Sequence, residues 1–347
     1  MKKLVLFFTL GCVALITVLS GLCFGAPPVK PEDFYRGKTI ELIVDTSPGS
    51  STDRMARVIQ PYLAERTGAT VVVKNMFGGG GLEGQNYIWS AKPNGLTIGA
   101  TMLSNISGPV ILETPGVRYQ VDKFGWIGCM GVEEIAVWTS ATGRIKSLAD
   151  LKEAKNIKFT GMGRTHIHSL WDMSAASWLS LDAKVLTGLS VQDTELLVLR
   201  GEADASISTA SRLLKGMKAG THKGLFVLTS TGKRMSALPD LPELREFTKL
   251  DPEEMKYYKL MVTVFNNVGK SLCTPPGVSK EILKFLRDTF IWITQQEKFN
   301  RDVEKMMGFA PVEYRSGKEL EEEAAAIIAN KKYLRDKFDF LINRYAD

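Results

Sequence analysis

Short apolar runs alternate with amphipathic stretches along this chain, and each apolar run ends at small or helix-breaking residues. The run 40–44 predicts a buried strand, which the Pro-Gly pair at 48–49 ends. From Asp53 the apolar positions recur every three to four residues up to Gly68, which predicts a helix. Pro61 lies inside this pattern and predicts a kink or an early stop. The first unit is therefore a strand, a small-residue loop and a helix.

The same order repeats further along the chain. Strands are predicted at 69–74 and 96–102, with a helix at 82–91 between them. The remaining predicted elements include strands at 157–160, 184–186, 205–207, 225–229 and 259–265, and long helices at 278–296 and 319–344. Strands joined by helices imply right-handed crossovers and parallel pairing. The predicted fold class is α/β, with two domains that each have a central sheet flanked by helices.

Three loops, 46–53, 77–81 and 161–169, share one design in which a strand ends, small residues turn the chain and a helix begins. In open α/β sheets, ligands bind outside the carboxyl ends of the strands, where such loops gather. The Ser, Thr or Asp at 51–53 is expected to cap the first helix, and a helix N-terminus attracts small anions. The alternative is that these residues cap a helix and contact no ligand.

The first 25 residues have the order of a secretory signal. Lys2 and Lys3 precede an uncharged apolar run, 4–24, and small residues follow it near an expected cleavage point at Gly25. An uncleaved anchor is the alternative, because the run is long enough to span a bilayer. About 320 residues remain, which suits two domains. No later segment is apolar enough to cross a membrane, so an exported protein is expected.

Charge and cysteine content narrow the classes of partner. The chain carries 44 Lys and Arg against 38 Asp and Glu, a net charge of +6, and removal of Lys2 and Lys3 lowers it to +4. The basic residues are scattered rather than striped, which excludes a nucleic-acid footprint and weakly favours small anions. Cys129 and Cys273 remain after the leader and are expected to be two separate thiols.

Motifs for other chemistry are incomplete. Residues 79–84 fit the dinucleotide pattern G-x-G-x-x-G, but the next strand ends without the acidic residue that holds a ribose, so no cofactor is expected. His166 and His168 lack the further ligands that a metal site needs, so no metal is expected. Arg164 is the guanidinium inside a candidate loop and would clamp a carboxylate. The alternative is a solvent-facing Arg164 at the rim.

Several ordered segments carry a family resemblance: 35–44, 47–53, 71–75, 93–97, 201–204, 236–242 and 274–278. Together they resemble the solute-binding receptors of tripartite tricarboxylate transporters, the Bug family. The resemblance implies a two-lobed periplasmic binding protein of type II, the Venus-flytrap kind. It divides the chain into a signal peptide at 1–25, lobe 1 at 26–133 and 256–347, and an inserted lobe 2 at 134–255. It also implies capture of a small organic acid and its delivery to membrane permease subunits.

The resemblance and the three loops together give the expected ligand-binding residues: Ser47, Gly49, Ser50, Ser51, Thr52, Asp53, Phe77, Gly78, Gly79, Gly80, Ser104, Asn105, Gly163, Arg164, Thr165, His166, Ser208 and Thr209. The chain departs from the family pattern in the second lobe. Relatives commonly carry Tyr-Lys/Arg-Gly-Gly where this chain has Gly-Leu-Ser-Val at 188–191, and many have an aspartate at the position of 208–209. We hypothesise that Arg164 supplies the positive charge that the altered segment lacks.

The function predicted from the sequence is a non-catalytic, monomeric periplasmic receptor that closes on an organic anion and hands it to a permease. Two alternatives remain open. One is a sensing receptor whose closed form contacts a signalling kinase, because both roles use the outer faces of the lobes. The other is an exported hydrolase or metal-dependent enzyme that uses His166, His168 and Asp172.

Overall fold

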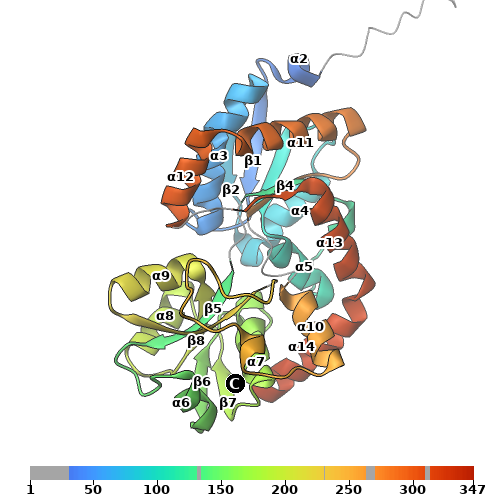
Figure 1. Ribbon diagram of the computed structural model, residues 1–347. Coiled ribbons are helices and arrows are strands. Elements are labelled where there is room, and N and C mark those ends of the chain that lie inside the picture. Colours follow the sequence, from blue (N-terminus) through green and yellow to red (C-terminus); the bar gives the residue numbers. More distant parts are fainter. Residues whose placement is uncertain (1–30, 131–133, 230, 263–269, 309–312) are drawn as a thin grey trace, which may run out of the picture.

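The computed structural model describes residues 31–130, 134–229, 231–262, 270–308 and 313–347. These residues form two α/β lobes, one above the other in Figure 1. The predicted secretory segment, 1–25, lies outside the described residues. Within the described part, none of the helices combines the length and the apolar character needed to cross a membrane.

The upper lobe is built around a six-stranded sheet with the order β11-β4-β10-β3-β1-β2. Its strands are β1 (Thr39–Val44), β2 (Thr70–Asn75), β3 (Thr97–Thr101), β4 (Gly125–Met130), β10 (Lys270–Thr274) and β11 (Arg315–Ser316). Strands β1, β2 and β3 pair in parallel, whereas β10 is antiparallel to both β3 and β4. The chain therefore leaves this sheet after β4 and returns to it at β10.

Helices cover both faces of the upper sheet. They are α2 (Pro31–Tyr35), α3 (Ser51–Thr67), α4 (Leu82–Ser90), α5 (Leu103–Ile111), α11 (Lys280–Thr294) and α12 (Glu297–Met307). Residues of β1 point alternately to the two faces: Leu42 and Val44 join the core under α3 and α11, and Ile43 joins the core on the other face. Because both faces are buried, β1 is apolar over nearly its whole length.

The lower lobe is built around β5 (Ile135–Ser140), β6 (Ile157–Thr160), β7 (Ala183–Leu186), β8 (Ser206–Thr209) and β9 (His222–Leu228). Strand β5 is antiparallel to β8 and β9, and β6 pairs with β7 in parallel. A parallel bridge between Phe159 and Ala205 joins the two groups of strands. The helices of this lobe are α6 (Leu148–Glu153), α7 (Ile167–Trp178), α8 (Val191–Leu199) and α9 (Ala210–Lys218).

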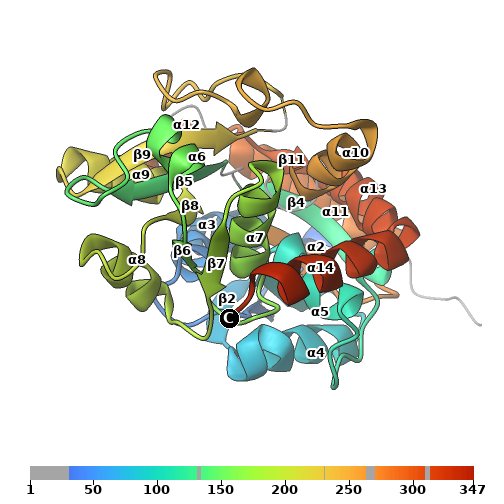
Figure 2. The same cartoon turned by 90° about the horizontal axis from the view of Figure 1, so that it is seen from below.

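Three further helices run along one side of both lobes in Figure 1: α10 (Pro252–Met261), α13 (Gly317–Ala329) and α14 (Lys331–Tyr345). Helix α13 packs on β4 of the upper lobe, whereas α14 packs on α5 and on α7 of the lower lobe. Figure 2 shows α14 beside α7, and Ala346 forms a parallel bridge with Val185 of β7. The end of the chain thus ties the lobes together, and the proposed division at 133/134 and 255/256 stays a prediction.

Several local predictions are wrong in detail. Helix α3 continues through Pro61 without an early stop and ends at Gly68, because Pro61 lies on the exposed side, where the carbonyl that loses its partner reaches water. Its N-cap is Ser50, not a residue of 51–53. The described part of the predicted strand 259–265 begins in the last turn of α10, which Asp251 caps and Pro252 starts. The predicted helix 319–344 is two helices separated at Asn330.

The cysteines behave as expected. Cys129 on β4 and Cys273 on the neighbouring β10 are both buried, and no disulfide joins them.

Candidate functional site

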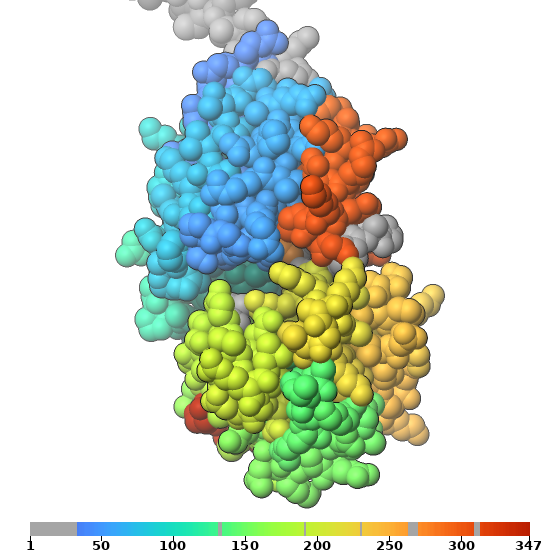
Figure 3. All heavy atoms as spheres, turned by 90° about the vertical axis from the view of Figure 1, so that its left-hand side faces the viewer, coloured from blue at the N-terminus to red at the C-terminus, as the bar shows by residue number. Residues whose placement is uncertain are grey.

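The carboxyl ends of the parallel strands in the two lobes point toward each other. In Figure 1, β1 runs downward from α2 to the lower lobe, and β6 runs upward from α6 to the upper lobe. Helices α3, α5, α7 and α9 are the next elements along the chain after β1, β3, β6 and β8. Figure 3 shows a recess along the seam between the lobes, below the blue atoms and above the yellow-green ones. The candidate site is this seam.

The Ser50 loop, residues 46–50, joins β1 to α3. Ser50 accepts the backbone N–H of Asp53 at 3.2 Å through Oγ, and the hydroxyls of Thr46 and Ser50 lie 2.7 Å apart. Among the predicted site residues here, Ser47 and Gly49 are exposed, Ser50 and Ser51 are half-buried, and Thr52 is buried. A side-chain cap leaves the other free N–H groups of the first turn available to a ligand.

Asp53 turns its carboxylate back into this loop. Its oxygens accept hydrogen bonds from the backbone N–H of Gly49 at 2.8 Å, from Asn75 Nδ2 at 2.9 Å and from Arg57 Nε at 3.1 Å. Burial alone would raise the pKa of Asp53, but the hydrogen bonds from Arg57, Gly49 and Asn75 outweigh it and lower the pKa. The Asp53 carboxylate therefore fixes the conformation of the Ser50 loop and keeps a negative charge in the first turn of α3.

The glycine loop follows β2 and contains a 3-10 turn, Gly78–Gly81. Gly79 and Gly80 have φ angles of 60° and 71°, in the left-handed region that favours glycine. Phe77 at its start is 52% exposed, which is high for a large apolar side chain. The loop thus presents backbone and an aromatic ring, rather than charge, at the carboxyl end of β2.

Sequence reasoning missed Asp45, the residue directly after β1. Its side chain is buried, and Oδ2 accepts hydrogen bonds from Gln85 Nε2 at 2.9 Å and from Thr101 Oγ1 at 2.5 Å. Tyr119 donates to Gln85 Oε1 at 2.7 Å and extends this network. Burial raises the pKa of Asp45 to about 6, although the bonds from Thr101 and Gln85 oppose the shift. An acidic residue that ends an apolar strand is the signal that would have found it.

Two predicted residues lie on α5, a helix that the sequence did not predict. Ser104 and Asn105 are in its first turn, Ser104 buried and Asn105 half-buried. One turn further along, Ser107 has a buried Oγ without a hydrogen-bond partner among the described residues. Helix α5 begins at the carboxyl end of β3, and β3 pairs with β1, the strand that leads into the Ser50 loop. These small polar side chains therefore lie at the strand end next to that loop.

The His166 loop, residues 161–166, joins β6 to α7 in the lower lobe. Gly163, Arg164 and Thr165 are exposed, and Arg164 makes no ion pair or hydrogen bond with any described residue. Ser169 donates from Oγ to the carbonyl of Gly163 at 2.8 Å and so fixes the loop against the helix. The Arg164 guanidinium therefore has no partner among the described residues, and its role as a clamp on a carboxylate stays a prediction.

His166 is the N-cap of α7, and its Nδ1 accepts the backbone N–H of His168 at 3.1 Å. Burial, with a smaller contribution from the charge of His168, lowers the pKa of His166 to about 4. The Nδ1 atom of His168 lies 3.1 Å from Oδ2 of Asp172, a carboxyl with no exposed surface. Burial raises the pKa of Asp172 to about 6, while His168 opposes the shift. No group of three or more His, Cys, Asp or Glu in the described part is arranged to hold a metal ion.

Ser208 and Thr209 end β8 and precede α9. Ser208 is buried, and Thr209, the N-cap residue, is half-buried with its Oγ1 3.2 Å from Oγ of Ser211. The predicted site residues therefore lie in loops or first turns that follow a strand, except Ser208 and Thr209, which are the last two residues of β8. The upper-lobe members follow the neighbouring strands β2, β1 and β3, and the lower-lobe members follow β6 or end β8.

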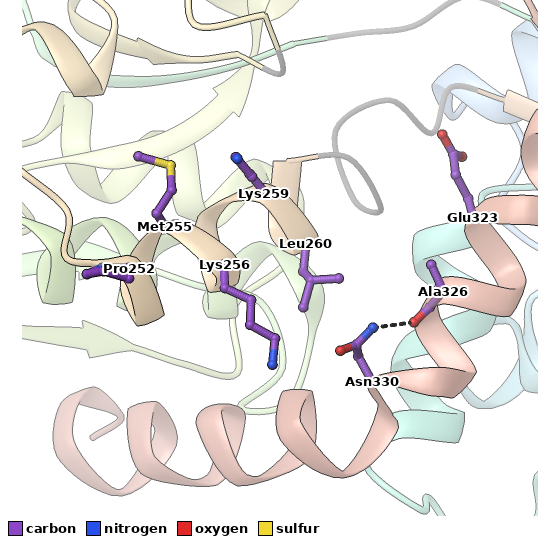
Figure 4. A pocket seen from close by; sticks show the side chains of 8 residues that line it. All are labelled: Pro252, Met255, Lys256, Lys259, Leu260, Glu323, Ala326 and Asn330. Carbon is purple, nitrogen blue, oxygen red and sulfur yellow. Dashed lines mark hydrogen bonds between the residues drawn. The ribbon is translucent and has the colours of Figure 1, made fainter.

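A separate pocket of about 480 Å³ lies away from these loops, where α10 meets α13 and α14 (Figure 4). It is lined by Pro252, Met255, Lys256, Lys259, Leu260, Glu323, Ala326 and Asn330. Its polar side chains do not converge: Asn330 donates to the carbonyl of Ala326 at 2.9 Å, and Lys256 lies over the ring of Tyr333. The pocket therefore lacks the polar arrangement of a ligand site.

Comparisons with known proteins agree on one architecture. No family model matches the chain. Protein BugT of Bordetella pertussis is 26% identical over 234 residues, which cover 64% of this chain and 69% of that protein. A TctC solute-binding protein from Polaromonas superposes with a TM-score of 0.66 at 18% identity, over 89% of this chain and 99% of its own. MatC of Rhodopseudomonas palustris with bound malate gives a TM-score of 0.65 at 18% identity, over 86% and 99%.

The two sheets, the return of the chain to the first sheet and the facing loops define the class: a two-lobed periplasmic binding protein fold of type II. Within this class, the chain is similar in sequence to Protein BugT and in fold to a TctC solute-binding protein. The predicted fold class and the predicted resemblance are both confirmed.

Proposed function

We propose that this protein is an exported receptor that captures a small organic anion, a carboxylate, between its lobes. The observation that carries the proposal is the meeting of four helix N-termini, those of α3, α5, α7 and α9, at facing strand ends. Each N-terminus offers unpaired N–H groups and the positive end of a helix dipole. Such groups replace the water around a carboxylate at small cost.

The side chains of the seam suit a small polar ligand. Hydroxyls of Ser50, Ser104 and Thr209 stand at three of the helix starts, and Arg164 adds a free positive charge from the lower lobe. A guanidinium and a carboxylate form paired, charge-assisted hydrogen bonds. MatC, which shares the fold, was solved with malate, and this supports a carboxylate as the chemical class.

Capture implies closure of the lobes over the ligand. Helices α13 and α14 join the lobes, because α13 packs on β4 and α14 packs on α7, so a hinge motion that keeps these contacts would bury the ligand. The proposal includes delivery to a membrane permease and a periplasmic location after removal of residues 1–25. It does not include catalysis, because the proteins of similar fold, a TctC solute-binding protein among them, are named as binding proteins.

A thermal-shift screen tests the ligand class. The mature protein is heated with malate, adipate, citrate and acetate in turn, with glucose and spermidine as uncharged and cationic controls. A ligand that binds the folded state stabilises it by RT ln(1 + L/Kd), where L is the free ligand concentration, and so raises the melting temperature. We expect at least one acid to raise the melting temperature and both controls to leave it unchanged. A shift with glucose or spermidine alone would overturn the carboxylate class.

A further inference from the structure

Phe77 is the most exposed large apolar side chain of the described residues, with 52% of its surface exposed. It lies two residues after β2, which is parallel to β1, so the carboxyl ends of both strands face the lower lobe. No aromatic ring or cation in the described part of the chain packs on the Phe77 ring. A single exposed ring is ordinary on a protein surface, but at a candidate site it is a contact surface for a ligand.

Leu189 follows the strand that lies across the seam from β2. Strand β7 is parallel to β6, which runs toward the upper lobe, so the carboxyl end of β7 also faces the seam. Figure 1 shows β2 above β7, and Figure 2, seen from below, shows the two strands close together in the plane of the view. The backbone N–H of half-buried Leu189 donates to the carbonyl of Gly161 at 3.4 Å, which holds this segment beside the His166 loop. Two apolar residues therefore follow the facing ends of β2 and β7.

The glycine loop between β2 and α4 has already used donors that could have held an anion. The backbone N–H of Gly78 donates to Glu83 Oε2 at 3.2 Å, and the backbone N–H of Gly81 donates to the carbonyl of Phe77 at 3.2 Å. Glu83 lies in the first turn of α4, so its carboxylate takes the positive end of that helix dipole. This end of the seam therefore disfavours a second carboxylate and suits an uncharged part of a ligand.

Helix α8, the next element after β7, begins in the same way. Ser190 accepts the backbone N–H of Asp193 at 3.1 Å and donates to Asp193 Oδ2 at 2.6 Å. Neither Glu83 nor Asp193 makes an ion pair with a described residue, whereas Asp53 of α3 pairs with Arg57. Helices α5, α7 and α9 have no acidic residue in their first turns. The seam is therefore divided: the starts of α5, α7 and α9 are open to an anion, and the ends of β2 and β7 are apolar and acidic.

We propose that the ligand is an aromatic carboxylate, whose ring packs between Phe77 and Leu189 and whose carboxylate lies at the starts of α5, α7 and α9. This inference rests on the proposed function and names the class of acid. An aromatic ring packs on a Phe ring in offset or edge-to-face geometry and gains further from its burial. A hydroxy acid such as malate or citrate would bury hydroxyl groups against these apolar side chains without hydrogen-bond partners. The site therefore favours a benzoate-like acid over a hydroxy acid.

Isothermal titration calorimetry with benzoate, malate and citrate tests this class of acid, and displacement of benzoate by acetate gives the affinity of a carboxylate without a ring. We expect the wild type to bind benzoate more tightly than the other three acids. Phe77→Ala should lower the affinity for benzoate about tenfold, the factor that burial of roughly half of a Phe side chain supplies. The affinity for acetate should not change, because acetate has no ring to place on Phe77. Leu189→Asn should also weaken benzoate binding and leave acetate binding unchanged.

Two further variants separate ring contact from loss of folding. Phe340 is 48% exposed but lies inside helix α14 rather than at a strand end, so Phe340→Ala should leave benzoate affinity unchanged. Phe77→Trp keeps an aromatic ring at the seam and should retain tight benzoate binding. Because both phenylalanines are exposed, the melting temperature of each ligand-free alanine variant should stay near that of the wild type.

The outcomes separate the two proposals. If malate or citrate binds and benzoate does not, or if Phe77→Ala binds benzoate as the wild type does, this inference is wrong and the proposed function stands. If Phe77→Ala weakens benzoate and acetate binding equally, the ring acts as a contact between the closed lobes and not on the ligand, which also overturns the inference. If none of the acids binds, benzoate included, the proposed function fails and the inference falls with it.

Discussion

Gly81 faces the backbone carbonyl of Asp45 so closely that a Cβ on Gly81 would lie 2.6 Å from that oxygen. This contact joins the end of the glycine loop to the carboxyl end of β1. Gly81 also has a φ of 100°, in the left-handed region. The position therefore requires glycine for two independent reasons, backbone conformation and space.

Gly81→Ala and Gly80→Ala form a matched pair. Gly80 has a φ of 71°, but a Cβ there would meet nothing within 4 Å. We expect Gly80→Ala to lower the free energy of unfolding by about 1 kcal/mol from backbone strain alone. Gly81→Ala should cost clearly more, because the loop must also move away from Asp45. Urea denaturation of both variants measures the difference, and equal costs would contradict the close contact.

Asp45→Asn should remove a pH dependence of stability. The pKa of Asp45 is raised from 3.8 to about 6 in the folded protein, so between these values the folded state holds a proton that the unfolded chain has lost. The free energy of unfolding therefore falls as pH rises through this range, by up to about 3 kcal/mol, and stays lower above it. Asparagine is neutral throughout, so the variant should lack this fall.

The measurement for Asp45 is urea unfolding at about pH 4 and about pH 8, with the wild-type change compared with that of the variant. Asp240→Asn, at an exposed carboxylate, is the control and should change with pH as the wild type does. If the Asp45→Asn and wild-type proteins lose the same stability over this range, the carboxyl of Asp45 is not the proton acceptor.

Asp53→Ala tests the architecture of the Ser50 loop. The substitution removes the acceptor for Gly49, Asn75 and Arg57 and leaves part-buried donors unpaired, at a cost of about 2 kcal/mol. Arg57→Ala removes one exposed partner of the same carboxylate and should cost less than about 1 kcal/mol. Urea denaturation of both variants measures the loss in free energy of unfolding. A larger loss for Arg57→Ala than for Asp53→Ala would contradict the structural role of Asp53.

Arg164→Ala separates ligand binding from stability. The guanidinium is exposed and makes no ion pair with the described residues, so the melting temperature of the ligand-free protein should not change. If Arg164 pairs with the ligand, the affinity for the acid found by thermal shift should fall about tenfold or more, as for a lost charge-assisted bond. Arg200→Ala is the matched control for net charge, because Arg200 is also exposed and is the C-cap residue of α8. Equal affinity for the two variants would remove Arg164 from the site.

Much of the local structure could be predicted because its signals lie within a few residues of each other. Helix α11 lies within the predicted helix 278–296, and β1, β2 and β3 lie where the apolar runs predicted them. Helix α5 was missed because Pro109 and the small residues around it resemble a loop in sequence. In the structure, α5 is stabilised by packing on α13 and α14, which lie more than 200 residues further along the chain.

The sequence by itself determined the α/β class, the three small-residue loops and the family resemblance, because each depends on the order of neighbouring residues. Only the tertiary structure decided that Asp45 is buried in a hydrogen-bond network with Gln85, Thr101 and Tyr119. It also decided that the Asp172 side chain is fully buried next to His168. It also decided that the last helix closes on the lower lobe. Burial and pKa depend on partners distant along the chain, and folding alone brings those partners together.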